Sequence, residues 1–313
     1  MFTFILRRML AGIPVMAMVV VIVFAILRLT PGDPATILAG DSATPEQLEQ
    51  IRRVMELDQP IYKQFFIWVN QLLHGDTGVS LLSGTPVSEM IMQRIGPSMA
   101  LCLSTIIVSV LLAIPLGVLA AWRQGKFLDR AVMAGSVMGF SVPVFVTGYV
   151  LILIFSIKLG WFPVQGYQPL SAGLWQFLSS LILPTIALST IYIALIARIT
   201  RTSIIEVIGE DFIRTARAKG LRERSVLLGH ALRNAAVPIV TIIGVGIALL
   251  ISGLVVTESI FNLPGLGRLV VEAVLARDYP VIQALILLFA FIYVFINLIV
   301  DVLYTVFDPR IRY

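Results

Sequence analysis

Long apolar runs separated by short polar segments dominate the chain. Each run approaches or exceeds the ~20 residues that a helix needs to cross ~30 Å of hydrocarbon. The apolar runs cover approximately residues 9–28, 98–121, 131–157, 181–200, 235–257 and 281–306. They are continuous, whereas the strands of a membrane barrel alternate apolar and polar residues over ~10 positions. Because a backbone inside a bilayer must satisfy its own hydrogen bonds, the pattern predicts an all-α polytopic membrane protein with six transmembrane helices.

The first apolar run has some features of a secretory signal. Arg7 and Arg8 precede the apolar stretch, as positive residues do in a signal. The stretch is longer than the typical signal core of about 7–15 residues, and TPGDP follows it in place of a small-residue cleavage site. We therefore expect an uncleaved transmembrane helix.

A hydrophilic segment, residues 29–96, separates the first two apolar runs. Within it, Thr44 followed by Pro45 is typical of a helix start, since threonine caps the first turn and proline suits its first position. Residues 61–75 repeat apolar side chains at helical spacing and end at Gly75, a typical stop. These stretches predict two amphipathic helices that lie on the membrane or on the outer face of the protein without crossing the bilayer.

The distribution of Lys and Arg predicts the orientation of the chain. With the N-terminus in the cytoplasm, the cytoplasmic segments carry 15 basic residues and the external segments carry 7. An excess of Lys and Arg marks cytoplasmic loops, and the bias holds on the short loops after the long segment 29–97 is discounted. We therefore expect both termini and the loop 202–234 to lie in the cytoplasm.

Glycine and proline lie inside two of the apolar runs. They are Gly135, Gly139, Pro143 and Gly148 in the third run, and Pro238, Gly244, Gly246 and Gly253 at or within the fifth. Small residues let helices approach closely, and neighbouring helices satisfy the backbone groups that a bend sets free. The pattern is typical of tight packing and, taken together, of a bundle that changes shape.

The composition excludes most catalytic chemistry. The chain is 58% hydrophobic and 13% charged, and its net charge of +5 indicates cytoplasmic loops rather than nucleic-acid binding. It has no P-loop, no HExxH motif and no GxSxG elbow. Its histidines, His74 and His230, fall on opposite sides of the predicted membrane, and Cys102 is its one cysteine. We expect no enzyme activity, no catalytic residue, no metal site and no cofactor bound by this chain.

Few ionisable residues fall inside the predicted helices, where such residues are functional candidates by default. Asp301, near the inner end of the sixth helix, is expected to pair with a basic residue there. Arg198 and Arg201 end the fourth predicted helix and are expected to reach the membrane interface. Glu258 ends the fifth on the outside. The sequence has neither the carboxylate chain of a proton-coupled carrier nor visible inverted repeats.

Charge gathers instead in EDFIRTARAKGLRERS, residues 210–225, where half of the side chains are ionised. The surrounding loop predicts a helix–turn–helix outside the membrane, in which Gly220 ends the first helix. Phe212, Ile213 and Ala216 are expected on its apolar face; Arg214, Arg217 and Lys219 are expected on its basic face. Two roles remain open on this pattern: anchoring to anionic lipid, or docking of a soluble partner that pushes on the bundle.

Several segments resemble one family along the whole chain. RTARAKG (214–220) resembles the cytoplasmic Glu-Ala-Ala…Gly motif of the inner-membrane permeases of binding-protein-dependent ABC importers, with Thr215 and Ala216 for the alanines and Gly220 for the glycine. HALRNAAVP (230–238) follows it, as is typical of one branch of this family. Arg214 replaces the usual acid and Pro238 comes late, as in the oligopeptide, dipeptide and nickel branch rather than the sugar branch. LRLTPGDP (27–34), GDTGVS (75–80), PVSEMIMQRIGPSMAL (86–101), ESIFNLPGLGRLVVEAV (258–274) and FDPRIRY (307–313) resemble the B-type subunit of that branch.

The resemblance implies the type I ABC importer permease fold and an assembly in the bacterial inner membrane. The expected partners are a homologous second permease, two ATPase subunits, an external solute-binding protein and membrane lipid, without nucleic acid. ATP and Mg are expected on the ATPase subunits. The residues expected to couple to the ATPase are Glu210, Asp211, Phe212, Arg214, Thr215, Ala216, Arg217, Ala218, Lys219 and Gly220.

An external segment is a second candidate site. It comprises Asn262, Leu263, Pro264, Gly265, Leu266 and Gly267. Its two interpretations are a gate or scoop near the binding protein, and a capped re-entrant turn without a role in gating.

The resemblance implies one half of a translocation pathway for di- or oligopeptides, with glutathione, nickel chelates, opines and sugars left open as solutes. The alternative function is an ion-gradient-driven secondary carrier. Residues 1–96 are predicted to form the first transmembrane helix and the external amphipathic segment. Residues 97–313 are predicted to form a five-helix permease core with the coupling loop 202–234.

Overall fold

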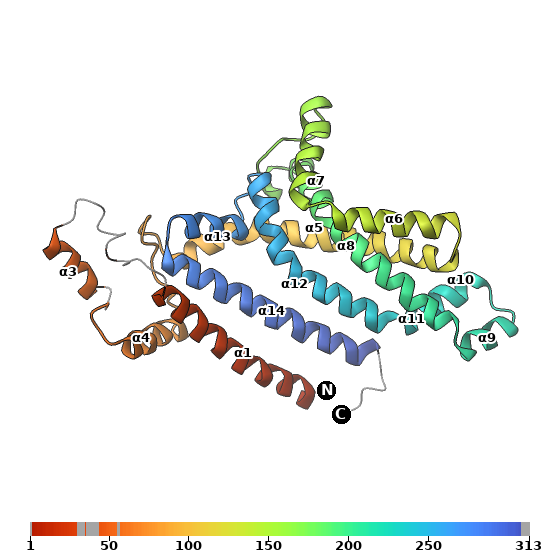
Figure 1. Ribbon diagram of the computed structural model, residues 1–313, viewed down its shortest axis with the longest axis horizontal. Coiled ribbons are helices and arrows are strands. Elements are labelled where there is room, and N and C mark those ends of the chain that lie inside the picture. The colour runs from red at the N-terminus through yellow and green to blue at the C-terminus, as the bar shows by residue number, and fades with distance from the viewer. Residues whose placement is uncertain (1, 30–34, 36–43, 55–56, 308–313) are drawn as a thin grey trace.

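The computed structural model describes residues 2–29, 35, 44–54 and 57–307, and it is helical almost throughout these ranges (Figure 1). The long helices are α1 (Phe2–Leu29), α5 (Val87–Trp122), α8 (Leu174–Ile208), α12 (Ala236–Ile260) and α14 (Tyr279–Phe307). The shorter ones are α3 (Pro45–Val54), α4 (Ile61–Leu73), α6 (Phe127–Ser141), α7 (Val144–Leu151), η1 (Ile152–Lys158), η2 (Leu170–Ala172), α9 (Asp211–Ala218), α10 (Glu223–Ser225), η3 (Val226–Ala231), α11 (Leu232–Asn234) and α13 (Leu266–Leu275). Within the described ranges the extended pairing is one isolated bridge, between Val79 and Pro86.

Five of the six predicted transmembrane helices are confirmed as continuous spans, and the remaining run forms a bent pair of helices. The five long helices are each apolar and long enough to cross a membrane. The third predicted helix, residues 131–157, is instead α6 followed by α7 and η1, and the two parts meet at an angle of 99°. The break falls at Val142 and Pro143, both in extended conformations. Proline has no N–H to continue the helix, and it disfavours a helical conformation of the residue before it. The sequence predicted that a bend was possible here, and the structure has a complete break between two helices.

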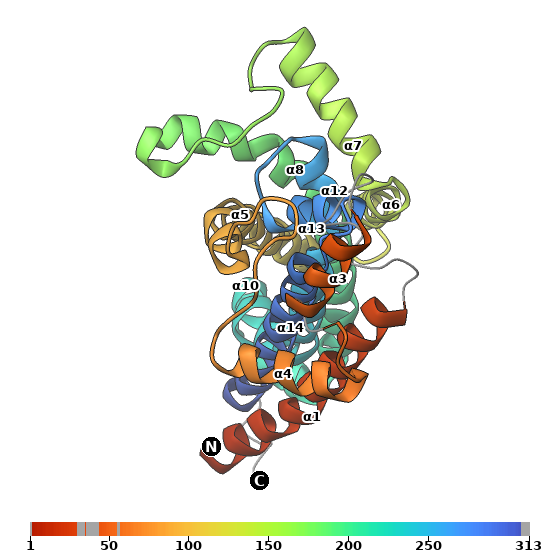
Figure 2. The same cartoon turned by 90° about the vertical axis from the view of Figure 1, so that its left-hand side faces the viewer.

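The long helices run side by side and give the molecule two ends (Figures 1 and 2). The start of α1, the end of α14 and the helix α9 lie toward one end, which we call the α9 end. The helices α3, α4 and α13 lie toward the opposite end, which we call the α13 end. The predicted loop 202–234 and the predicted external segment therefore occupy opposite ends of the bundle.

The two amphipathic helices predicted before the second span are present as α3 and α4. The Thr44 carbonyl accepts the Leu48 N–H at 3.0 Å, as expected at a helix start. α4 packs on α1 through Phe24, whose ring centroid lies 5.2 Å from that of Phe65 and 5.7 Å from that of Trp68. These contacts hold α4 at the α13 end of α1, and neither helix is long enough to span a membrane.

The central pair of the bundle is α5 and α8. Small buried residues recur every four positions along α5, at Thr105, Ser109, Ala113 and Gly117. A side chain at Gly117 would overlap Thr200 of α8, so the two backbones approach closely there. Ser104 and Thr185 add an interhelical hydrogen bond of 2.7 Å. Close backbone approach of this kind is what stabilises helix pairs in a membrane, where burial from water contributes little.

Two ion pairs join helices near the α9 end. Asp301 of α14 contacts Arg8 of α1 at 3.1 Å, which confirms the predicted pairing of Asp301 with a basic residue. Asp129 of α6 is buried, binds Arg201 of α8 through both carboxylate oxygens, and accepts the Gly125 N–H at 2.8 Å. The expectation that Arg198 and Arg201 end their helix is wrong, because α8 continues to Ile208. Arg201 pairs with Asp129 instead of reaching the interface alone.

Candidate functional site

The charged segment folds as the short helix α9, which is anchored from beneath. Ile213 is fully buried and Ala216 nearly so, in a cluster with Val118 and Ala121 of α5 and Ile204 of α8. Positions 213 and 216 lie on one face of a helix because they are three residues apart. The anchor therefore connects α9 to both helices of the central pair.

The opposite face of α9 is exposed. It carries Arg214, Thr215, Arg217, Ala218 and Lys219. Phe212 is 43% exposed and lies at the edge of the anchor, so the predicted apolar face of three residues is reduced to Ile213 and Ala216. The result is a basic surface with one half-exposed aromatic ring.

The turn after α9 is shaped by Gly220 and by one ion pair. Gly220 has a φ of +77°, a left-handed conformation that glycine adopts without strain, and it follows the end of the helix as predicted. Arg217 donates to both carboxylate oxygens of Glu223, at 2.6 and 3.2 Å, across the turn. The Glu223 carboxylate raises the pKa of the Arg217 guanidinium. The pair therefore holds α9 against α10, the start of the second arm of the predicted helix–turn–helix.

The second arm is anchored in the same cluster. Val226, Leu227 and Ala231 of η3 are buried beside Ala235, which precedes α12. The exposed Asp211 and Arg214 form a further pair at 3.0 Å on α9. Exposed ion pairs contribute roughly 0–1 kcal/mol each, so an approaching charged surface can replace them at little cost. The loop therefore combines exposed charged side chains, which can change partners, with a backbone that is anchored by buried apolar residues.

The second candidate segment, between α12 and α13, folds around a buried carboxylate. Glu258 is fully buried and accepts hydrogen bonds from the Ser98 hydroxyl at 2.5 Å and from the Arg268 N–H at 3.0 Å. Ser98 in turn accepts the Leu266 N–H at 2.7 Å. Buried carboxylates are tolerated when hydrogen bonds satisfy their oxygens, and these bonds tie the segment to α5.

The glycines of this segment are explained by the same carboxylate. A side chain at Gly265 would overlap the Glu258 carboxylate, and one at Gly267 would meet both that group and the Val255 backbone. Of the remaining predicted residues, Leu263 and Leu266 are buried, whereas Asn262 and Pro264 are exposed. Asn262 makes the turn with a φ of +51°. The segment is closely packed against the ends of α5 and α12.

Two further carboxylates hold the same region to the residues before and within α5. Glu272 of α13 contacts Arg94 of α5 at 2.7 Å and Arg268 at 2.8 Å. Asp278 accepts the Ser80 hydroxyl at 2.5 Å and the Leu81 N–H at 3.1 Å. Three carboxylates between residues 258 and 278 thus bind partners between residues 80 and 98. We call these three contacts the carboxylate clamps.

Ser80→Ala tests the clamp farthest from the bundle. Ser80 is buried, and its hydroxyl also accepts the N–H groups of Leu82 and Ser83. Removing it leaves a buried carboxylate oxygen without its donor, which costs about 1–3 kcal/mol. We expect the free energy of unfolding in detergent to fall by about that amount. Ser88→Ala, at an exposed position of α5, should leave it unchanged; equal effects of the two variants would contradict the clamp.

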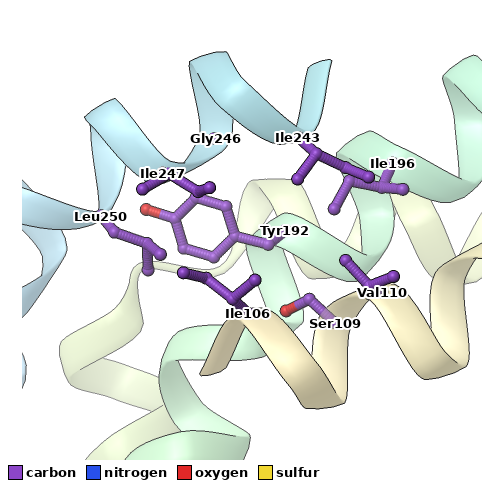
Figure 3. A pocket seen from close by; sticks show the side chains of 9 residues that line it. All are labelled: Ile106, Ser109, Val110, Tyr192, Ile196, Ile243, Gly246, Ile247 and Leu250. Carbon is purple, nitrogen blue, oxygen red and sulfur yellow. The ribbon is translucent and has the colours of Figure 1, made fainter. Parts of the chain in front are cut away.

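Side chains of α5, α8 and α12 meet around Tyr192 and leave a small pocket between the three helices (Figure 3). The ring of Tyr192 lies between the helices, next to Gly246, where an added side chain atom would come within 3.4 Å of it. The remaining gap has a volume of about 10 Å³ and is lined by apolar side chains such as Ile106 and Leu250. Such a gap is about the size of one water.

Sequence reasoning missed the partners of these buried groups. Ser98 was not singled out, and Glu258 was expected only to end a helix on the outside. Ser98 and Glu258 are separated by 160 residues, and Asp129 and Arg201 by 72. The one available signal was an ionisable residue at the edge of an apolar run, which indicates a site but does not indicate the partner.

The chain matches two family models that together cover most of it. Residues 113–313 match the binding-protein-dependent transport system inner membrane component, and residues 1–102 match the N-terminal part of the same membrane components. The chain belongs to the binding-protein-dependent transport system inner membrane component family. It is therefore a multi-pass inner-membrane permease of a binding-protein-dependent ABC importer, and the resemblance seen in RTARAKG and the other segments is confirmed.

Individual relatives cover the whole permease. It is 50% identical over 310 residues to the "Probable peptide ABC transporter permease protein y4tP" of Sinorhizobium fredii, with 99% of each chain covered. It is 42% identical over 313 residues to the glutathione transport system permease protein GsiC of Escherichia coli, with both chains fully covered. A solved chain of the MetNI methionine ABC transporter, in inward-facing conformations, superposes with a TM-score of 0.59 at 16% identity. That match covers 71% of this permease and 97% of the MetNI chain and confirms the type I importer fold.

Proposed function

We propose that this permease forms half of the translocation pathway of an ATP-driven importer of di- or oligopeptides, together with a homologous second permease. The full-length similarity to permeases named for peptide and glutathione transport supports this solute class, since glutathione is itself a small peptide. Only a gap of about 10 Å³ remains beside Tyr192 between α5, α8 and α12. This supports a pathway shared with a second subunit rather than one between these three helices.

The α9 segment is the proposed docking element for two separate ATPase subunits, which carry ATP and Mg. The support is structural: α9 exposes a basic surface, and its anchors Ile213 and Ala216 belong to the same buried apolar cluster as residues of α5, α8 and η3. A push on α9 can therefore reach two membrane-spanning helices through this cluster. Basic side chains suit a partner surface that carries carboxylates.

The orientation follows from the same proposal. The α9 end, with both termini, faces the cytoplasm, and the α13 end receives solute from an external binding protein. The basic residues of α9, α10 and the adjoining turns lie at the α9 end, in agreement with the positive-inside rule. The carboxylate clamps make the segment 262–267 part of the rigid frame of α5, so we propose that it seats the binding protein and moves together with α5.

Import requires that ATP favours one conformation over another. A ligand that binds two states equally shifts neither, and a complete switch needs a differential affinity of about 10⁴-fold. The proposed source is ATP-driven closure of the two ATPase subunits, which changes the position of α9 in both permeases at once.

Reconstitution of the complete importer in liposomes tests this function against the secondary carrier. We expect uptake of a labelled tripeptide to require ATP, both ATPase subunits and the binding protein, and to persist when the proton and sodium gradients are collapsed. Uptake that survives removal of the ATPases but stops when the gradients collapse would establish the carrier instead.

Cross-linking tests the docking surface. In a Cys102→Ser background the chain has no other cysteine, so Lys219→Cys introduces a single thiol on the exposed face of α9. A short thiol-to-amine cross-linker should join it to an ATPase subunit. Lys63→Cys, at an exposed position of α4 near the other end, should give no such product. Cross-linking to the ATPase from position 63 but not from position 219 would reverse the proposed orientation.

A further inference from the structure

A groove between α6 and α8 has a volume of about 210 Å³. It is therefore far larger than the gap of about 10 Å³ beside Tyr192 and has room for several waters. Its lining includes Met133, Ser136, Val137 and Phe140 of α6, and Leu195 and Arg198 of α8. A cationic side chain thus lies in a mostly apolar groove inside two helices that belong to membrane-spanning segments.

Arg198 has no partner for its charge in the part of the chain that the structure describes. Its neighbour one turn along α8, Arg201, is bound by both oxygens of the Asp129 carboxylate. For Arg198, by contrast, the described residues provide neither an ion pair nor a hydrogen bond of its side chain, and the residue is exposed. An arginine within the apolar part of a membrane protein is costly unless an anion or water meets it.

The position of Arg198 argues against simple contact with the membrane surface. Side chains on a helix lean toward its N-terminus, which for α8 is away from the α9 end. Ala194 and Leu195, which line the same groove, lie in that direction. Ser136 is nine residues into α6, about 14 Å along the helix from its start near the α9 end.

The rest of the lining suits a peptide terminus. Ser136 and Ser141 donate their hydroxyl protons to carbonyl oxygens of their own helix, at 2.9 and 2.8 Å. Each hydroxyl oxygen therefore keeps lone pairs that can accept an N–H. The guanidinium of Arg198 presents a planar set of donors that matches a carboxylate, and the apolar walls can contact a side chain beside it.

The groove lies on the side of the bundle opposite the two helices whose spans are most exposed. Figures 1 and 2 place α6 on the side away from α1 and α14. Those two helices pack together and have largely exposed, apolar spans, as expected of helices in contact with lipid. α6 therefore lies on the face of the bundle opposite this pair of helices.

We propose that Arg198, in the groove between α6 and α8, binds the carboxylate of a peptide on its way through the importer. This inference rests on the proposed function and adds a subsite to it: an Arg198–carboxylate pair, with Ser136 and Ser141 accepting N–H groups of the peptide backbone. Passage of a free acid is thereby favoured over passage of the corresponding amide.

Uptake of two matched probes tests the subsite in the complete reconstituted importer. The probes are a labelled tripeptide and its C-terminal amide, each supplied at saturating concentration of loaded binding protein so that the rate reports steps after delivery. We expect the wild-type importer to transport the acid about tenfold faster than the amide, the factor typical of a charge-assisted hydrogen bond. Arg198→Gln should lower the rate for the acid to that of the amide and leave the amide rate unchanged.

Two further variants separate charge from structure. Arg198→Lys keeps the charge without the planar fork and should restore part of the preference for the acid. Arg123→Gln, an exposed arginine at the α9 end outside the groove, should retain the wild-type preference. Equal loss of acid and amide transport in Arg198→Gln, or no loss of either, overturns the subsite. If the wild-type importer transports neither probe, the peptide function itself is wrong.

Thiol labelling decides whether the anion comes from solute or from lipid phosphate. In the Cys102→Ser background, Arg198→Cys should react with a charged, water-soluble thiosulfonate, and the unlabelled tripeptide should slow that reaction during turnover. Reaction only with a membrane-soluble maleimide, unaffected by peptide, would place the groove against lipid and overturn the proposal.

Discussion

Gly220→Arg is expected to abolish uptake while the permease still inserts and assembles its helices. Gly220 is exposed, and nothing lies within 4 Å of a side chain added there, so the loop itself accommodates the new group. A partner protein packed against α9 would leave no space for the arginine side chain. If the added bulk costs the docked state about 3 kcal/mol, coupling falls by about a hundredfold. Uptake by the reconstituted importer, together with the amount of permease in the membrane, measures the effect.

Two variants distinguish loss of docking from backbone strain. The φ of +77° at Gly220 strains any other residue, so Gly220→Ala carries the strain without the bulk and should keep most of the uptake. Gly75→Arg places the same side chain at another exposed left-handed glycine, after α4 near the α13 end, and should not affect ATPase association. Normal uptake and normal ATPase association in Gly220→Arg would show that the partner does not contact this turn.

Glu258→Ala is expected to destabilise the permease more than any surface substitution. The carboxylate is fully buried, and its loss leaves Ser98 and the Arg268 N–H without their acceptor and opens a cavity under Gly265. Each buried donor left without its acceptor costs about 1–3 kcal/mol, so the two donors and the cavity together cost about 3–5 kcal/mol. The free energy of unfolding in detergent should fall by that amount, and uptake should fall with it because the α12–α13 segment loses its attachment to α5.

The conservative variant at the same position sharpens this expectation. Glu258→Gln keeps the volume and one acceptor oxygen, so its loss should be smaller, about 1–2 kcal/mol. Glu89→Ala removes an exposed carboxylate from the first turn of α5, at the same end of the molecule, and should change stability by less than about 0.5 kcal/mol. A Glu258→Ala permease as stable as Glu89→Ala would show that the clamp does not hold the segment.

Much of the fold could be predicted from the sequence because the bilayer leaves few alternatives. Continuous apolar runs of about 20 residues must be helices, and all six predicted runs are helical. Local signals were also sufficient where the responsible residues are neighbours in sequence. Examples are the start of α3 after Thr44 and the end of α9 before Gly220.

Contacts between distant residues could not be predicted in the same way. The 99° angle at Val142 and Pro143 depends on what α7 packs against, whereas the sequence shows only that a bend is allowed. The clamps pair side chains whose separation in sequence gives no indication of their contact. The half-exposed position of Phe212 could not be predicted either, because it depends on which residues of other helices pack against α9.

The helix α5 contacts both candidate sites. Its 36 residues extend over about 54 Å. Val118 and Ala121 near one end lie in the buried cluster that anchors α9, while Arg94 and Ser98 near the other end bind Glu272 and Glu258 of the carboxylate clamps. If α5 tilts at the α9 end, the carboxylate clamps at the α13 end should be displaced with it; in the proposed importer that is where the binding protein docks. In that importer, one continuous helix would couple nucleotide turnover on one side of the membrane to the arrival of solute on the other.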